Sequence, residues 1–149
     1  MMNIWGLSAE QTAAFMGNIY HEGVYSSLNA QDSMGWDGVF NPEYMDVFSL
    51  TDSTGWGILQ WTDEKRKAGL LEFASGEGTD IGNMDTQLKY LFHEITTVDP
   101  DYFKWEEIRN SNDVDHLTWL VMVYVVGPSD QNLEDRQIEA WKQLAIITK

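Results

Sequence analysis

The chain has 149 residues, a length typical of one compact domain, and 43% of them are hydrophobic, which is enough material for a single core. Asp and Glu number 24 against 9 Lys and Arg, so the formal net charge of −15 disfavours binding to nucleic-acid phosphates or anionic lipid. Cysteine is absent, which excludes disulfides and thiolate metal sites. We therefore expect one domain over residues 1–149, with neither nucleic acid nor membrane as a partner.

The ends and the most apolar segment bear on where the domain acts. The N-terminus lacks the basic and apolar regions of a secretory signal peptide. The longest apolar stretch, residues 117–126, is too short to cross a bilayer. We expect any export of the domain to depend on a larger parent protein or on a virus particle.

The first part of the chain predicts one helix, a long loop and a hairpin. The helix begins after Ser8, which forms a capping-box pair with Gln11, and it ends at Gly23. From residue 24 to 53 the helical period disappears while Gly, Asp and Asn become frequent, so we expect a loop with short elements. Residues 54–61, Thr-Gly-Trp-Gly-Ile-Leu-Gln-Trp, favour a strand or hairpin.

Two amphipathic helices are predicted next. Thr62 is the expected N-cap of the first, and Gly76 and Gly78 end it. Its predicted core residues are Leu70, Leu71, Phe73 and Ala74. Residues 85–95 form the second, which carries a regular apolar stripe. The stripe consists of Met84, Leu88, Leu91, Phe92 and Ile95.

The last part of the chain predicts three more helices. A weaker helix is expected from Pro100 toward Arg109, because proline is favoured at a helix start. Residues 113–126 are apolar nearly all round, which predicts a helix buried on every side; the β-branched residues also fit a strand, but the segment is long for one. Gly127 closes it, and residues 132–146 form the last helix. The apolar side of that helix consists of Leu133, Ile138, Trp141, Leu144 and Ala145.

Glu22 is the first candidate catalytic residue. On a helical wheel it projects between Phe15 and Ile19, on the apolar stripe of the first helix. Burial disfavours ionisation, so a carboxyl group there is expected to keep its proton near neutrality, as a general acid requires. The alternative is that Glu22, in the last turn, extends its side chain into solvent. Periodicity alone leaves both interpretations open.

Two blocks of sequence, Gly17-Asn-Ile-Tyr-His-Glu-Gly23 and Gly55-Trp-Gly-Ile-Leu-Gln-Trp-Thr62, resemble the phage tail lysozyme family. In that family a Gly-Asn-x-x-x-Glu-Ser helix end precedes a Gly-x-Gly-x-x-Gln-Trp-Thr hairpin, and a helix containing Arg, here Arg66, follows. Residues 70–74 and 87–91 and Glu94 agree as well. The second block is also similar to goose-type lysozymes and lytic transglycosylases. One departure is that glycine, not serine, follows the glutamate.

The resemblance implies an α+β, mainly α-helical, lysozyme-like catalytic domain over residues 1–149, with a buried central helix and a small β-hairpin beside the active-site cleft. It implies that Glu22 is the catalytic glutamate and that residues 55–62 line the cleft. The predicted substrate-binding residues are Trp56, Gln60, Trp61, Thr62 and Tyr124. Indole rings can stack on sugars and an amide can hold an N-acetyl group, although about half of these aromatic side chains are expected to pack in the core.

Many glycosidases use a second carboxylate. Asp52, just before the hairpin, is the first candidate, because goose-type lysozymes resemble this chain in having an Asp there that holds water. Asp63, just after the hairpin, is another, with a helix-start carboxylate as the competing explanation. Asp32 and Asp37 in the loop stay open, and a lytic transglycosylase needs no second carboxylate.

The resemblance implies a peptidoglycan hydrolase, a muramidase that cleaves the β-1,4 bond between N-acetylmuramic acid and N-acetylglucosamine. The alternatives are a lytic transglycosylase giving 1,6-anhydro products and a non-catalytic wall-binding or structural module of a phage tail. Expected partners are peptidoglycan glycan strands and other tail or wall-binding modules, at the virion tail or the extracellular cell wall. We expect no cofactor and no metal, because the three histidines, His21, His93 and His116, are scattered.

Overall fold

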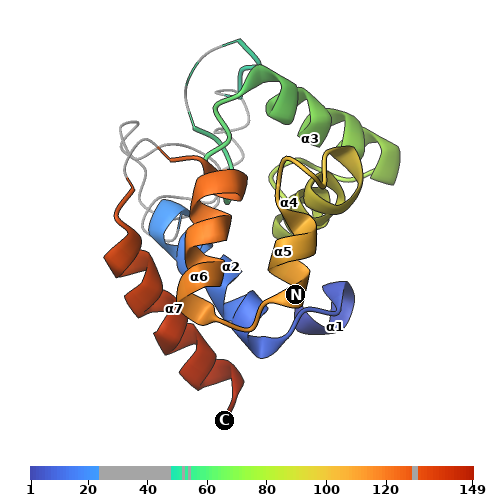
Figure 1. The fold of residues 1–149 in the computed structure, drawn as a ribbon. Helices are drawn as coiled ribbons and strands as arrows, with labels where there is room; N and C mark the ends of the chain where they lie inside the picture. The colour runs from blue at the N-terminus through green and yellow to red at the C-terminus, as the bar shows by residue number, and fades with distance from the viewer. Residues whose placement is uncertain (24–47, 52, 54, 129–130) are drawn as a thin grey trace. The chain divides into compact units, whose positions relative to one another are not determined.

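The computed structural model describes residues 1–23, 48–51, 53, 55–128 and 131–149 (Figure 1). The chain divides into two compact units, one made of Met1–His21 with Phe92–Lys149 and the other of Glu22–Leu91. The described residues are mainly α-helical. None of their helices is long and apolar enough to cross a bilayer. The single catalytic domain over residues 1–149 stays a prediction.

All regular elements described in the first unit are helical. In chain order they are α1 (Met2–Trp5), α2 (Ala9–Gly23), the π-helix η3 (Glu94–Val98), α5 (Trp105–Asn110), α6 (Val114–Leu120), the π-helix η4 (Val121–Val126) and α7 (Leu133–Ile147). The last two residues of α2, Glu22 and Gly23, belong to the second unit. Helix α6, drawn in orange, contacts α7, drawn in red (Figure 1). The buried apolar side chains of this unit include Ala13, Ala14, Phe15, Leu117, Val121 and Val125.

Helix α2 confirms the predicted capping box. The backbone N–H of Ser8 donates to Oε1 of Gln11 at 2.9 Å, and the backbone N–H of Gln11 donates to Oγ of Ser8 at 3.2 Å. The Gln11 amide also donates to the backbone oxygens of Arg109 and Ser111, at 2.9 and 3.1 Å. The same side chain that starts α2 therefore attaches it to the end of α5.

The segment predicted as a buried helix is helical, as α6 followed without a break by η4. Asp113 caps it, because its Oδ1 accepts the backbone N–H groups of Asp115 and His116, both at 3.0 Å. Gly127, with φ of 63°, ends it in the left-handed conformation that glycine tolerates. Burial on every side is wrong, since Trp119 is 37% exposed.

Helix α7 forms where predicted, but its apolar side is not the side that it buries. Ile138 and Trp141 are exposed, whereas Arg136, Glu139 and Ala140 are buried. The reason is a close approach of α2, which leaves room for the small Ala140 at the contact and none for a large side chain. Ile138, Trp141 and Ile146 therefore remain on the surface of α7, whereas Leu133 and Leu144 are half-buried.

The second unit contains a tight turn over residues 55–61 and the helices α3 (Glu64–Glu77) and α4 (Met84–His93), the last of which ends in the first unit. Its buried apolar side chains include Trp56, Ile58, Leu59, Trp61, Leu70 and Tyr90. The described residues contain no β-strand, and the predicted hairpin consists of one antiparallel bridge between Trp56 and Trp61. The β component of the predicted fold is therefore reduced to this bridge within the part of the chain that is described.

Helix α3 begins one residue later than predicted. Its N-cap is Asp63 and not Thr62: Oδ1 of Asp63 accepts the backbone N–H groups of Lys65 and Arg66, at 2.9 and 3.0 Å. A carboxylate at the cap also interacts favourably with the helix dipole, which a hydroxyl does less well. Leu71, predicted in the core, is exposed, whereas Lys67 is buried and donates to the backbone oxygen of Ser49 at 3.0 Å.

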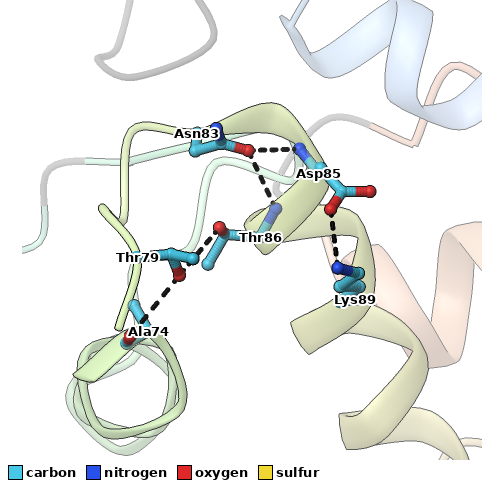
Figure 2. A network of polar contacts seen from close by, with 6 residues as sticks. All are labelled: Ala74, Thr79, Asn83, Asp85, Thr86 and Lys89. Carbon is cyan, nitrogen blue, oxygen red and sulfur yellow. Dashed lines mark hydrogen bonds and ion pairs between the residues drawn. The ribbon is translucent and has the colours of Figure 1, made fainter. Parts of the chain in front are cut away.

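A chain of polar contacts joins the end of α3 to the start of α4 (Figure 2). Oδ1 of Asn83 caps α4 by accepting the backbone N–H groups of Asp85 and Thr86, at 2.9 and 3.2 Å. The Thr86 hydroxyl donates to the Thr79 hydroxyl at 3.0 Å, and the latter donates to the backbone oxygen of Ala74 at 3.4 Å. These bonds fix the first turn of α4 and with it the next residue, Gln87.

Candidate active site

Glu22, the predicted catalytic glutamate, lies in the last turn of α2 and is half-buried. Its position is intermediate between the two interpretations that the helical period left open. A half-buried carboxyl group is accessible to a substrate while protein atoms still surround part of it. Such a position suits a group that must exchange a proton with a bound ligand.

Asn18 lies one turn before Glu22 in α2 and is fully buried. Its amide nitrogen donates to the backbone oxygens of Ala14, at 3.0 Å, and Thr118, at 3.1 Å. Its Oδ1 accepts a hydrogen bond of 3.2 Å from Nη1 of Arg136, which is buried as well. One side chain therefore links the C-terminal half of α2 to α6 and α7.

Gly17 precedes Asn18 and brings α2 close to α7. A Cβ atom at residue 17 would lie 2.7 Å from the backbone oxygen of Arg136 and 2.8 Å from the backbone nitrogen of Ala140. Both neighbours are backbone atoms, so no larger residue fits without separating the two helices. The Gly-Asn pair of the first block is thus explained: the glycine permits the contact and the asparagine fixes it.

The second block forms the tight turn. The backbone groups of Trp56 and Trp61 exchange hydrogen bonds of 3.1 and 2.8 Å, and the N–H of Gln60 donates to the Gly57 oxygen at 3.0 Å. Gly57 has φ of 81°, and a Cβ atom there would lie 2.7 Å from the Trp61 ring. A Cβ atom at Gly55 would lie 2.8 Å from Oε1 of Gln60. Gly57 is therefore required by its backbone conformation and by close packing, whereas a side chain at Gly55 would first displace the flexible end of Gln60.

Gln87 of α4 holds this turn in place. Its Oε1 accepts the backbone N–H of Ile58 at 2.8 Å, and its amide nitrogen donates to the backbone oxygen of Ile81 at 2.8 Å. The side chain is fully buried. Gln87 agrees with the family pattern, but the sequence indicates no role for it. Its partner Ile58 is 29 residues away, and such a distant contact leaves no local signal.

The predicted sugar-stacking rings of the turn are buried. Trp56 is 2% exposed and packs edge-on against Phe48, and Trp61 is 1% exposed and packs edge-on against Tyr90. Both rings thus belong to the core of the second unit. Neither indole N–H has a hydrogen-bond partner among the residues that the structure describes. Rings this deeply buried offer no free face on which a sugar could stack.

The other predicted binding residues reach the surface to different degrees. Gln60 is half-buried and donates from its amide to the Gly57 oxygen at 2.9 Å, and Thr62 is exposed. Tyr124, which belongs to the first unit, is half-buried in η4, with Nζ of Lys104 5.4 Å from its ring centre.

Of the four candidates for a second carboxylate, the structure describes Asp63. The carboxylate of Asp63 caps α3, which favours the structural explanation for this residue. Asp52, Asp32 and Asp37 lie outside the described residues. A second catalytic carboxylate therefore stays a prediction.

Comparison with known proteins identifies the family. A family model for phage tail lysozymes matches residues 1–146, so it covers both motif blocks and nearly all of the chain. The chain belongs to the phage tail lysozyme family. Membership of this family implies an activity that degrades peptidoglycan. No curated protein matches the chain in sequence.

Proposed function

We propose that the chain is a muramidase of a phage tail, that residues 1–149 form its single catalytic domain, and that Glu22 is the general acid. The observation that carries the proposal is the position of Glu22: half-buried, at the end of a helix that Gly17 and Asn18 attach to α6 and α7. The match to phage tail lysozymes over residues 1–146 supports the choice of substrate.

The reaction begins with transfer of the Glu22 proton to the oxygen that links N-acetylmuramic acid to N-acetylglucosamine. The bond from that oxygen to C1 of the muramic acid breaks, and positive charge spreads over C1 and the ring oxygen. Water then adds to C1 and loses a proton to a carboxylate. In this proposal Asp52 stabilises the charge or positions the water, and Gln60, Thr62 and Tyr124 contact the substrate because their side chains are not fully buried.

A lytic transglycosylase is the second candidate. The capping role of Asp63 favours it, because one of the acidic residues near the turn is already committed to α3. In this reaction Glu22 first protonates the leaving oxygen, and the 6-hydroxyl group of the muramic acid then attacks C1 and transfers its proton to the Glu22 carboxylate. The anhydro product is lighter by one water molecule, so mass spectrometry of the released fragments distinguishes the two reactions.

The experiment compares wild type with Glu22→Gln on purified peptidoglycan. Loss of the transferable proton should reduce release of soluble fragments by about 10²-fold or more. Glu10→Gln is the matched control, because Glu10 lies in the first turn of the same helix and should keep wild-type activity. Equal activity of wild type and Glu22→Gln would remove Glu22 from the mechanism. A wild type that releases nothing across pH and salt would identify a non-catalytic module.

A further inference from the structure

Two tryptophan rings lie on the surface of the first unit, on helices that contact each other. Trp141 of α7 is 51% exposed and Trp119 of α6 is 37% exposed. Exposing two indole rings is unfavourable for a protein in water, and exposed apolar patches commonly mark interaction sites. The two exposed rings therefore indicate an interaction site on α6 and α7.

Asp115 of α6 contacts one of the two rings directly. Its Oδ1 accepts the indole N–H of Trp141 at 2.8 Å, and its backbone oxygen accepts the Gln137 amide at 3.2 Å. Trp119 is four residues further along α6, so it lies on the same face as Asp115, one turn away. The carboxylate that binds the Trp141 ring therefore lies on the helix face that also carries Trp119.

Both rings are held before any ligand arrives. Trp119 stacks on His116, with ring centres 5.8 Å apart, and Nε2 of His116 lies 3.0 Å from a Glu107 oxygen. The Tyr124 ring packs edge-on against Trp119, with ring centres 6.0 Å apart. Rings that are already ordered lose little conformational freedom on binding, which favours affinity.

The chemistry of the patch matches a sugar. A pyranose ring has an apolar face of C–H groups that covers an indole, and hydroxyl groups at its edge that donate to a carboxylate. Oδ2 of Asp115 has no partner among the described residues and is available as an acceptor. The carboxylates of Glu107 and Asp113 near the patch oppose binding to an anionic membrane.

We propose that Trp119, Asp115 and Trp141 form a glycan-binding site that extends substrate contact from Tyr124 across α6 to α7. The ligand is an uncleaved strand of β-1,4-linked N-acetylated sugars. The inference rests on the proposed function for its choice of ligand. Tyr124 connects the proposed active site with the glycan-binding site, because its ring packs against Trp119. The site holds the strand and takes no part in bond cleavage.

The test measures binding in the full chain carrying Glu22→Gln, so that turnover is removed. The probes are a hexamer of N-acetylglucosamine and soluble glycan strands freed of their peptides. Calorimetry gives the affinity, and the indole N–H signals in NMR spectra show which tryptophans contact the ligand. Trp141→Ala and Trp119→Ala should each weaken binding of the strands about fivefold to tenfold. Trp141→Phe, which keeps an aromatic ring but loses the bond to Asp115, should weaken it less.

Tyr102→Ala is the control, because Tyr102 is also an exposed aromatic residue of this unit and its ring packs against Phe103 and not against the patch. It should leave the affinity unchanged. Unchanged affinity in both Trp→Ala variants, with no shift of their indole signals, would overturn the inference. The inference would also be overturned if the protein is a dimer in solution and Trp141→Ala converts it to a monomer without changing glycan affinity. The patch would then be a self-association surface. Since binding is measured without turnover, an inactive wild type would refute the muramidase and leave this result intact.

Discussion

Two fully buried amide side chains, Asn18 and Gln87, organise the two units in different ways. Asn18 lies inside a regular helix and bonds to neighbouring helices, through the Thr118 oxygen and the Arg136 guanidinium. Gln87 bonds to irregular backbone, the Ile58 N–H and the Ile81 oxygen. Asn18 fixes the contact between helices whose backbone hydrogen bonds are already made within each helix. Gln87 supplies the irregular backbone with hydrogen bonds that a neighbouring strand would otherwise provide.

The bonds of Gln87 explain how the described part of the second unit is stable without a β-sheet. A buried backbone N–H without a partner is costly, so an irregular buried segment needs a substitute for ladder hydrogen bonds. At Ile58 that substitute is one side chain from α4, a helix whose start is fixed by Asn83 and Thr86 (Figure 2). The turn is therefore only as stable as its contact with α4.

The largest effect is expected from Gly57→Ala. The new Cβ atom would lie 2.7 Å from the Trp61 ring and 2.8 Å from Oε1 of Gln87, at a φ of 81° that disfavours any side chain. Strain and overpacking together should lower the free energy of unfolding by about 3 kcal/mol, measured by denaturant titration. Gly76→Ala is the control, because Gly76 is helical with open space around its Cβ position, and it should be neutral or stabilising. Equal effects of the two variants would contradict the packing argument.

A second pair of variants compares the two amides directly. Asn18→Leu removes an acceptor from a buried guanidinium and should lower the free energy of unfolding by about 2 to 3 kcal/mol. Gln87→Met should lower it by about 2 kcal/mol, because it leaves the Ile58 N–H without its acceptor. Hydrogen exchange shows which part of the protein each variant destabilises. Gln87→Met should speed exchange of the Ile58 amide selectively, whereas Asn18→Leu should loosen the contact of α2 with α6. A loss of Ile58 protection in both variants alike would show that the amides do not act locally.

Local sequence signals predicted some helix ends, but the helix expected from Pro100 begins only at Trp105. The pairing of Ser8 with Gln11 and the stop at Gly127 depend on residues within one turn of each other, so the sequence alone indicates them. The same locality explains the error at Thr62, where two adjacent residues can cap and the carboxylate of Asp63 is preferred. Helix existence follows from neighbouring residues, and so it was predictable.

The buried face of α7 and the role of Gln87 were not predictable from local patterns. The exposure of Ile138 and Trp141 follows from a close contact between Gly17 and Ala140, more than a hundred residues apart in the chain. For the site, the family resemblance indicated Glu22 and the turn, but whether an indole stacks on a sugar or packs in the core depends on residues distant in sequence. Trp56 is accordingly a core residue.

The smallest effect is expected from Lys89→Met, at the exposed end of the α4 network. Nζ of Lys89 lies 2.7 Å from Oδ2 of Asp85, four residues earlier in the helix, and this hydrogen bond and the charge of Asp85 raise the pKa of Lys89 (Figure 2). A raised pKa means that the stabilisation is complete below the unfolded-state pKa of about 10.4 and is lost as pH rises through the folded-state value.

Thermal melts of Lys89→Met and wild type should therefore differ slightly at neutral pH, by less than any variant above, and the difference should vanish at more alkaline pH. Added salt should reduce it as well, because both side chains are exposed to solvent. Lys65→Met is the control, since Lys65 is exposed and has no ion pair with the described residues. A difference that persists above the lysine pKa would mean that the aliphatic stem of Lys89, and not its charge, stabilises α4.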